Sequence, residues 1–328
     1  MSARGAPPAA GAAGGGAPRR LRALFVSDVY FPRINGVSTS LDCFADELRR
    51  RGHTVELLAP RYGDEAVRLG VLRVPSRRVP FDPEDRMMKA QRALALEATL
   101  RRYRFDLVHV HTPFVAHHVG TRLARRLGLP LVLTYHTFFA EYLHHYVPLA
   151  PARWLRGLAR TVSRRQCQQA DAVVVPSSAM RDVLAGYGVT TAMEVLPTGL
   201  PLAELAGGSG AAFRAHHGIP AERPTLVHVG RMAHEKNVGF LLEVVERARR
   251  QRPDVLLVLA GEGPALPALR RQAREMGVGA NTLFVGYLDR RRELLDCYRA
   301  ADAFLFASRT ETQGLVLLEA MALGVPVV

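Results

Sequence analysis

Short apolar runs alternate with longer amphipathic stretches along nearly the whole chain, and this alternation restricts the possible folds more than any other feature. The runs are rich in Val, Leu and Ile, as expected for parallel strands that are buried on both faces of a sheet. The stretches between them are long enough for helices that cross over from one strand to the next. We therefore predict an α/β chain with doubly wound parallel sheets.

The first half of the chain contains one complete set of these elements. A strand at 21–27 precedes a helix that carries Leu41, Phe44 and Leu48 on one face and ends at Gly52. Further strands are predicted at 54–59, 106–111, 130–136, 171–176 and 193–197. These segments predict a first Rossmann-like domain.

A break in composition separates this set from a second one. Residues 199–224 are rich in Gly, Ala and Pro and have little strand signal, so the domain boundary is predicted there. The alternation restarts with strands at 225–230, 255–261, 282–286 and 303–308, and with helices at about 238–251, 265–276 and 290–300. We predict a disordered tail (1–20), a first domain (21–199) and a second Rossmann-like domain (200–328). The final run, LGVPVV, begins a strand as the chain stops, so we expect a truncated, incomplete second domain.

Length and cysteine use restrict the class of protein. With 328 residues, 48% of them hydrophobic, the chain can bury two cores. Cys43, Cys167 and Cys297 lie far apart, which fits neither a disulfide framework nor a zinc site and indicates a reducing compartment. No apolar run has the length of a membrane span, and the tail lacks the apolar segment of a secretion signal. A cytoplasmic protein is therefore expected.

The net charge of +14 is distributed unevenly along the chain. Residues 1–200 contain 28 Lys and Arg against 16 Asp and Glu, whereas residues 201–328 contain 16 against 14. The first half is therefore expected to meet a negative partner, which can be a nucleic acid, an anionic lipid or a phosphorylated substrate. Because the chain has no RNP, zinc-finger or helix-turn-helix pattern, we expect no nucleic-acid partner.

The segment HVGRMAHEKN carries the first chemical signal. A strand is predicted to end at Gly230, and Arg231 and Lys236 follow on the loop that leads into a helix. Ligands bind beyond the carboxyl ends of strands in doubly wound sheets, and two cations beside a helix N-terminus suit a diphosphate. Taken alone, an ordinary basic loop explains this segment equally well.

The segment ETQGLVLLEA carries the second signal. Gly314 allows a close turn into a helix, with Glu311 on the loop before it and Glu319 inside it. The N–H groups of Leu315 and Val316 would be free to point at an anion. Glu311 could accept hydrogen bonds from sugar hydroxyls and Glu319 from a ribose, although two surface glutamates at this spacing are common.

Together, the two segments resemble the donor site of glycosyltransferase family 4. The resemblance covers about residues 21–328, and it is strongest to bacterial diacylglycerol glucosyltransferases and related GDP-mannose-dependent mannosyltransferases. It is also carried by SDVYFPRINGVSTS (27–40), HTPF (111–114), TYHTFFAEYLHHY (134–146) and CQQADAVVVPS (167–177). The resemblance implies the GT-B fold, in which two Rossmann-like domains face each other across a cleft.

The resemblance also implies further site residues. Gly36 would let backbone N–H groups approach the donor phosphates, although many relatives carry two glycines where this chain has an Asn-Gly pair. His136, just past a strand, matches the histidine that contacts the donor sugar and helps to stabilise the transition state. His136 and Glu311 are therefore the predicted catalytic residues. Tyr287 and Leu288 are predicted to lie near the base of the nucleotide.

Neither a cofactor nor a metal ion is expected. No GxGxxG pattern lies between the first strand and helix, which argues against nicotinamide and flavin, and GEGPAL (261–266) is interpreted as close packing near the nucleotide. The chain has no Asp-x-Asp motif, and the family pattern needs no metal. Arg231, Lys236 and helix N-termini would offset the charge of the leaving diphosphate instead.

The predicted reaction is the retaining transfer of a hexosyl group from a donor of the UDP-glucose or GDP-mannose type to a membrane lipid or a glycan. The segment 153–166 predicts a basic amphipathic helix with Trp154, Leu155, Leu158 and Val162 on its apolar face, and such a helix can lie on an anionic membrane. The enzyme would then be peripheral on the inner face of the cell membrane. A core-packed crossover helix with a solvated arginine face is the alternative for this segment. Two other functions are left open, namely a transferase with a soluble acceptor and an inactive nucleotide-sugar-binding protein. The two donor-site segments argue against a sugar-nucleotide epimerase on the same fold, and no sequence pattern supports a nucleic-acid binder.

Overall fold

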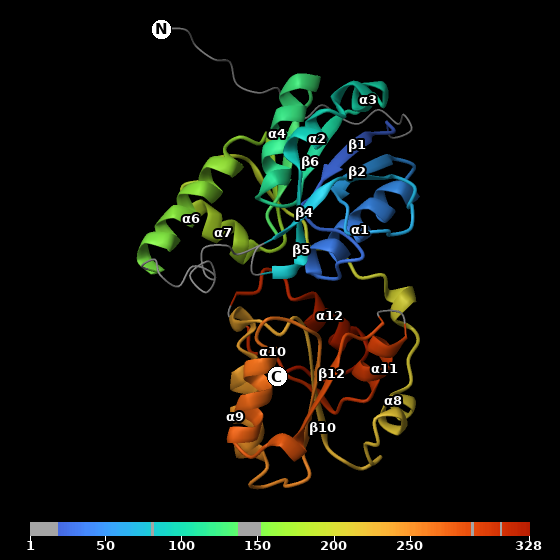
Figure 1. Cartoon of the computed structure of the whole chain (residues 1–328), viewed down its shortest axis with the longest axis vertical. Coiled ribbons are helices and arrows are strands. Elements are labelled where there is room, and N and C mark those ends of the chain that lie inside the picture. The colour runs from blue at the N-terminus through green and yellow to red at the C-terminus, as the bar shows by residue number, and fades with distance from the viewer. Residues whose placement is uncertain (1–18, 80–81, 137–151, 290–291, 309) are drawn as a thin grey trace, which may run out of the picture.

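The computed structural model describes residues 19–79, 82–136, 152–289, 292–308 and 310–328. Figure 1 shows two domains, one above the other, each built on a parallel sheet with helices on both sides. The predicted α/β fold with two Rossmann-like domains is therefore confirmed. Residues 1–18 of the predicted tail lie outside the described residues.

The first sheet has seven parallel strands in the order β3-β2-β1-β6-β7-β8-β9. Its strands are β1 (Arg22–Val26), β2 (Thr54–Pro60), β3 (Val71–Val74), β6 (Leu107–Val110), β7 (Leu131–Thr134), β8 (Ala172–Val175) and β9 (Met193–Val195). The strand order reverses between β1 and β6. In open α/β sheets this reversal is where ligands bind, beyond the carboxyl ends of the strands.

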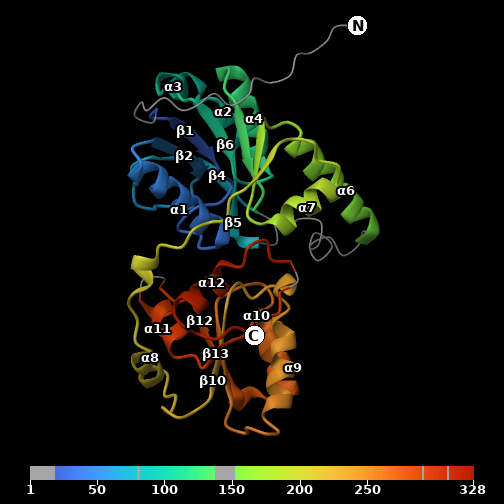
Figure 2. The same ribbon diagram turned by 180° about the vertical axis from the view of Figure 1, so that it is seen from behind.

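Helices cover both faces of this sheet, as Figures 1 and 2 show from opposite sides. They are α1 (Gly36–Arg50), α2 (Ala90–Leu94), α3 (Glu97–Arg102), α4 (Val115–Leu127), α6 (Ala152–Cys167) and α7 (Ser178–Gly186). Neighbouring residues of β1 pack into different hydrophobic clusters on the two faces of the sheet. Val26 belongs to the cluster that includes Val119 of α4, and Phe25 belongs to the cluster that includes Leu41 of α1. Burial on both faces explains why the strand reads as a continuous apolar run.

Three strands of the first domain were not predicted from the sequence. β3 extends the main sheet, and β4 (Ser76–Val79) pairs in antiparallel fashion with β5 (Asp82–Met88). Val74 and Met88 are buried, but charged residues lie between them, so no continuous apolar run marks the segment. A hairpin of this kind depends on packing against the domain more than on its own sequence pattern.

The second sheet has four parallel strands in the order β12-β11-β10-β13. They are β10 (Thr225–Val229), β11 (Leu256–Ala260), β12 (Thr282–Gly286) and β13 (Ala303–Phe304). β13 is shorter than the predicted strand at 303–308, although the backbone N–H of Leu305 still donates to the carbonyl of Val227 at 2.8 Å. A single bridge joins Phe304 to Val327 in place of a further regular strand.

Helices and short 3-10 turns surround the second sheet. The helices are α8 (Gly210–His216), α9 (Val238–Ala248), α10 (Leu266–Glu275), α11 (Glu293–Arg299) and α12 (Leu315–Ala322). The 3-10 turns are η1 (Leu202–Leu205), η2 (His234–Lys236) and η3 (Gly279–Asn281). Within the described part of the chain, no helix combines the length and apolarity that a membrane span requires.

Candidate functional site

The loop before α12 contacts the first domain through Thr312 and Gln313. The Thr312 hydroxyl donates to the backbone carbonyl of His136 at 2.9 Å, and the Ser177 hydroxyl donates to the carbonyl of Thr312 at 3.0 Å. The amide side chain of Gln313 accepts from the backbone N–H of Thr198 at 2.8 Å and donates to its carbonyl at 2.7 Å. These contacts bring the segment after β13 against the end of β7, so His136 lies where the two domains meet.

Lys236 and Glu311 form an ion pair on the second-domain side of this region. The Lys236 Nζ lies 2.6 Å from Glu311 Oε2, and the two side chains are 24% and 28% exposed. Lys236 ends η2 after β10, and Glu311 precedes α12 after β13. Because β10 and β13 are neighbouring strands, the loops that follow them meet at one edge of the sheet. The sequence predicted both residues for the site but not their pairing.

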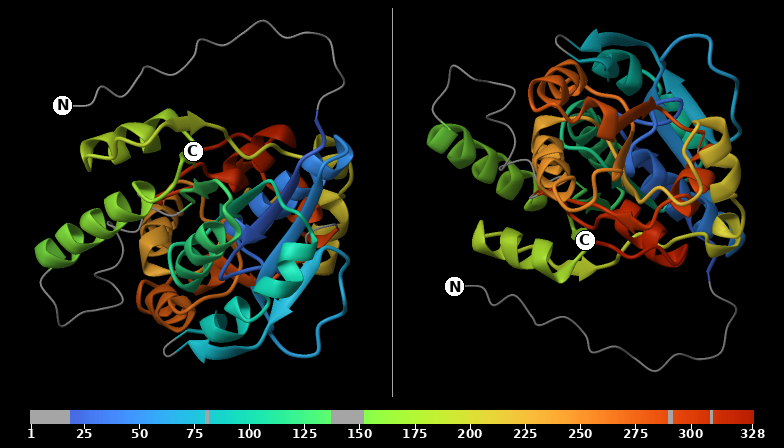
Figure 3. Two further views of the ribbon diagram at one scale, coloured as in Figure 1. Left: turned by 90° about the horizontal axis from the view of Figure 1, so that it is seen from above. Right: turned by 90° about the horizontal axis from the view of Figure 1, so that it is seen from below.

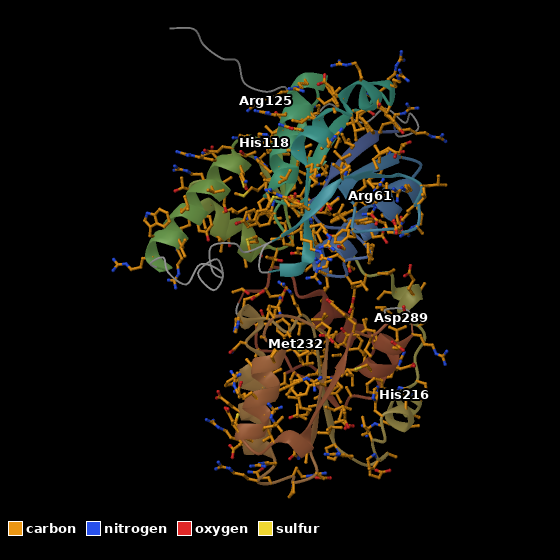
Figure 4. The ribbon with its side chains drawn as sticks, viewed as in Figure 1. Arg61, His118, Arg125, His216, Met232 and Asp289 are labelled. Carbon is orange, nitrogen blue, oxygen red and sulfur yellow. The ribbon has the colours of Figure 1, made fainter. Side chains whose placement is uncertain are left out.

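Two glycines allow the loop after β11 to pack tightly against the loop after β10. A Cβ on Gly261 would lie 1.9 Å from the carbonyl oxygen of Gly230, and a Cβ on Gly263 would lie 2.5 Å from that of Met232. Met232 is fully buried inside the second domain (Figure 4). The interpretation of GEGPAL as a close-packing turn is therefore confirmed, and the turn fixes the backbone from which Arg231 extends.

Gly314 sets the start of α12, as the sequence predicted. Its φ of +72° lies in the left-handed region, and a Cβ there would approach Leu317 Cδ1 to 2.8 Å. Leu315 and Val316 form the first turn of the helix, where backbone N–H groups have no partner within the helix. Glu311 lies on the preceding loop, so the first turn and this carboxylate occupy the same end of the helix.

Glu319 lies deeper in the second domain than a surface residue would. Its exposed fraction is 2%, and its carboxylate accepts a hydrogen bond from the Tyr298 hydroxyl at 2.9 Å. Burial excludes the alternative of two ordinary surface glutamates for this member of the pair. The predicted contact between Glu319 and a ribose stays a prediction.

The loop after β1 reaches the second domain through a buried arginine. The guanidinium of Arg33 donates to Asp85 Oδ1 at 3.0 Å and to the hydroxyl of Tyr287 at 2.8 Å. Asn35 caps α1 by accepting from the backbone N–H of Ser38 at 2.9 Å. A Cβ on Gly36, the first residue of α1, would meet nothing within 4 Å, so the local fold leaves the backbone there open to a ligand.

Three histidines lie at the carboxyl ends of β6 and β7, and of these His111 is buried while His109 and His136 are half-buried. His111 Nδ1 is 3.0 Å from His136 Nε2, and His109 Nε2 is 2.7 Å from the hydroxyl of Thr134. Burial lowers the pKa of His109 to about 3 and that of His136 to about 4, and it lowers the pKa of His111 well below 6.5. All three rings are therefore neutral at physiological pH. The alternation of His109 and His111 on one strand was visible in the sequence, but the contact with His136 was not.

A buried carboxylate at the strand reversal was missed by the sequence reasoning. Asp28, which follows β1, accepts from the backbone N–H of Ala116 at 2.9 Å and from the hydroxyl of Thr112 at 2.9 Å. It thus caps the N-terminus of α4 from a distant segment. Burial raises the pKa of Asp28 to about 6 in spite of these hydrogen bonds.

Comparisons with known proteins agree with this geometry. Residues 34–204 match the sequence model of Glycosyltransferase Family 4. The chain belongs to Glycosyltransferase Family 4. Residues 210–328 of this Family 4 enzyme match Glycosyl transferases group 1, so the chain is a glycosyltransferase, as the resemblance implied.

Two sequence relatives of the Family 4 enzyme have names that specify a product or a donor. It is 33% identical over 322 residues to the alpha-monoglucosyldiacylglycerol synthase of Streptococcus pneumoniae. This match covers 94% of this chain and 70% of that protein. It is 28% identical over 319 residues to the GDP-mannose-dependent alpha-mannosyltransferase of Corynebacterium glutamicum. This match covers 94% of this chain and 72% of that protein.

Solved structures show the same fold as the Family 4 enzyme. The complex of Anabaena Alr3699/HepE with UDP and glucose superposes with a TM-score of 0.73 at 18% identity and covers 94% of this chain and 80% of that chain. The sucrose-phosphate synthase of Thermosynechococcus elongatus gives a TM-score of 0.71 at 21% identity with the same coverage. These likenesses confirm the GT-B arrangement of two Rossmann-like domains.

The Family 4 enzyme thus brings His136, Lys236 and Glu311 to one region, while the roles of the predicted site residues stay predictions. Leu288 packs against the core of the second domain, and its predicted position near a base also stays a prediction. Residues 137–146 of the histidine-rich motif lie outside the described residues. In the described ranges, no cluster of three or more His, Cys, Asp and Glu side chains is arranged to hold a metal ion, and the prediction of a metal-free reaction remains to be tested.

Proposed function

We propose that this enzyme transfers a hexosyl group, with retention of anomeric configuration, from a nucleotide diphosphate sugar to a membrane lipid. The observation that supports the proposal most is the joining of His136 to the loop of Glu311 through the Thr312 hydroxyl, at 2.9 Å. This contact unites the predicted sugar-binding residues of the two domains at one interface. The relative named alpha-monoglucosyldiacylglycerol synthase supports a lipid acceptor, and both UDP-glucose and GDP-mannose are donors to be tested.

In the proposed mechanism, the donor diphosphate lies beside Arg231, Lys236, Gly36 and the first turn of α12. Fixed cations and helix N-termini stabilise the charge of the leaving diphosphate without reorganising during the reaction. Glu311 is held by its ion pair with Lys236 and accepts hydrogen bonds from sugar hydroxyls. The acceptor hydroxyl attacks from the face of the leaving group, and the departing phosphate takes its proton.

The helix α6 supports an acceptor that lies in a membrane. Figure 3 shows α6 and α7 extending side by side from the edge of the first domain. Leu155, Ala159, Ser163 and Cys167 of α6 are buried against the domain, so Leu155 belongs to the core side and not to the predicted membrane side. A second apolar stripe faces outward, with Trp154 62%, Leu158 43% and Val162 41% exposed.

The same helix carries positive charge. The exposed arginines of α6 are Arg153, Arg156, Arg160, Arg164 and Arg165. An exposed apolar stripe on an arginine-rich helix fits an anionic lipid surface, where each basic residue near the surface contributes about 1 kcal/mol of attraction.

A pocket connects the outward face of α6 with the histidine pair. It has a volume of about 80 Å³, and its described lining includes Val162 and Gln166 of α6, Phe114, His111 and His136. Val162 is therefore shared between the outward stripe and the pocket. In the proposal, the acceptor hydroxyl approaches His136 from the side of α6.

Transfer and membrane binding are tested together with purified enzyme and vesicles. We expect hexose transfer from UDP-glucose or GDP-mannose to diacylglycerol in anionic vesicles. The nuclear magnetic resonance spectrum of the product should show the α configuration at the anomeric carbon, as retention requires. Co-sedimentation should require anionic lipid and weaken at high salt, because salt screens the attraction. Trp154→Ser should reduce co-sedimentation, whereas Phe240→Ser, a control on α9 with a 47% exposed side chain, should not.

Three results would contradict parts of the proposal. Enzyme that stays in solution with anionic vesicles at low salt would exclude the membrane surface and favour a soluble acceptor. An inverted product would exclude the retaining mechanism. Failure to transfer any hexose in the presence of either donor would favour an inactive nucleotide-sugar-binding protein.

A further inference from the structure

The hydrogen bond between His111 and His136 requires one ring to donate and the other to accept. The donor and acceptor atoms are His111 Nδ1 and His136 Nε2, 3.0 Å apart. Because burial keeps the pKa of each ring far below neutrality, each imidazole carries a single N–H at physiological pH. The direction of this hydrogen bond therefore decides which nitrogen of His136 carries its proton.

The surroundings of His111 favour one direction. Its Nε2 is buried, and among the residues that the structure describes it has no hydrogen-bond partner. If His111 accepted at Nδ1, its proton would lie on Nε2 as a buried N–H without an acceptor. If His111 donates from Nδ1, only a lone pair is left at Nε2. Buried N–H groups without an acceptor are the rarer of the two cases in folded proteins.

The ring of His111 is also held in its plane by its neighbours. Its centroid lies 4.6 Å from that of Phe25 and 4.1 Å from that of His109. The His109 ring is itself fixed by its hydrogen bond to the Thr134 hydroxyl. His111 can therefore not turn away from His136 without disturbing this packed group.

We propose that His111 donates its Nδ1–H to His136 and thereby fixes His136 as the Nδ1–H tautomer. His111 is then a positioning residue, and the Nδ1–H of His136 is a neutral donor for an oxygen of the sugar or of the departing phosphate. His136 in this state cannot accept a proton at Nδ1, so it does not act as a general base there. The inference rests on the proposed function for the identity of that oxygen, but the tautomer can be measured without any substrate.

Nuclear magnetic resonance of enzyme labelled with ¹⁵N in its histidines reads the tautomers directly. Two-bond ¹H–¹⁵N correlations, assigned by comparison with His111→Leu and His136→Gln, should show Nδ1–H for both His111 and His136. In His111→Leu, His136 should lose its preference for Nδ1–H. A His136 that is protonated at Nε2 in the unaltered enzyme would overturn the inference.

Turnover gives a second readout that a purely structural role would not produce. His111→Asn keeps an N–H near the position of Nδ1, whereas His111→Asp places an acceptor there and demands a proton on Nε2 of His136. We expect kcat to fall by about 100-fold more in the Asp variant than in the Asn variant, as for loss of one transition-state donor, with little change in the KM of the donor sugar. Equal losses in the two variants would overturn the inference.

A control separates this inference from the proposed function. His118→Gln alters an exposed histidine on α4, in the part of the first domain away from the second domain (Figure 4), and should leave the His136 signals and kcat unchanged. If the His136 tautomer is Nδ1–H but no hexose transfer occurs with either donor, the proposed function fails and the tautomer assignment stands.

Discussion

Acidification from pH 7.5 to 5.5 should destabilise the first domain more than the second. A histidine whose pKa is lower in the folded state contributes stability that is present above its unfolded pKa, near 6.5, and is lost as the pH falls below it. His109, His111 and His136 all have lowered pKa values because of burial in the first domain. In the second domain, burial lowers the pKa of His228 to about 4.

The size of the effect follows from these pKa values. Over this pH range protonation in the unfolded state lowers the free energy of unfolding by about 1.4 kcal/mol for each such histidine, so the three first-domain histidines together lower it by about 4 kcal/mol. Asp28 acts in the opposite direction, because burial raises its pKa to about 6. As the pH falls, protonation removes the buried charge and raises the free energy of unfolding by about 1 kcal/mol. The lowered pKa of His117 adds to the loss. We expect the first domain to lose about 3 kcal/mol or more, against about 1 kcal/mol for His228 in the second.

Urea denaturation followed by pulsed hydrogen exchange and mass spectrometry reports each domain through its own peptides. Asp28→Asn should increase the loss in the first domain by about 1 kcal/mol, because the neutral amide retains an oxygen for the Ala116 N–H and no longer gains from acid. Arg125→Gln, a substitution of an exposed residue on the same helix α4 as His118 (Figure 4), serves as the control. A first domain whose free energy of unfolding differs by less than 1 kcal/mol between the two pH values would refute this reasoning.

Two predictions concern the donor site. Arg231→Ala and Lys236→Ala should each weaken the binding of UDP or GDP by about 2–3 kcal/mol, because each removes a charged hydrogen bond, and titration calorimetry with unchanged affinity for both variants would reject the site. Glu311→Gln and His136→Ala should lower kcat far more than nucleotide affinity, since their contacts strengthen in the transition state. Equal loss of turnover and affinity would instead indicate a structural role for Glu311 and His136.

The elements that could be predicted are those whose signal is local. The helix predicted at 238–251 is observed as Val238–Ala248, and the strand predicted at 54–59 is observed as Thr54–Pro60. In the helix, periodic apolar residues form one buried face, whereas in the strand a continuous apolar run is buried on both faces. Either pattern is a property of a few consecutive residues. Gly314 was predicted for the same reason, because a turn with positive φ next to a helix favours glycine wherever it occurs.

Several contacts of the site could not be predicted because their partners are far apart in the chain. Lys236 and Glu311 meet only because β13 lies beside β10, although the two residues are 75 positions apart. Arg33 reaches Tyr287 over 254 positions. Such pairs depend on the order of the strands in the sheet and on how the two domains pack. Neither can be predicted from a few consecutive residues.

The class of fold, the loops after β10 and β13 and the amphipathic character of α6 could be predicted from the order of the residues. The facing of Leu155 to the core and of Trp154 outward, and the contact between His111 and His136, follow from the packing of the folded chain. The physical reason is the same in each case. Periodicity and turn chemistry act between neighbours in sequence, whereas burial, pKa shifts and hydrogen-bond direction depend on atoms that come together only when the sheet has formed.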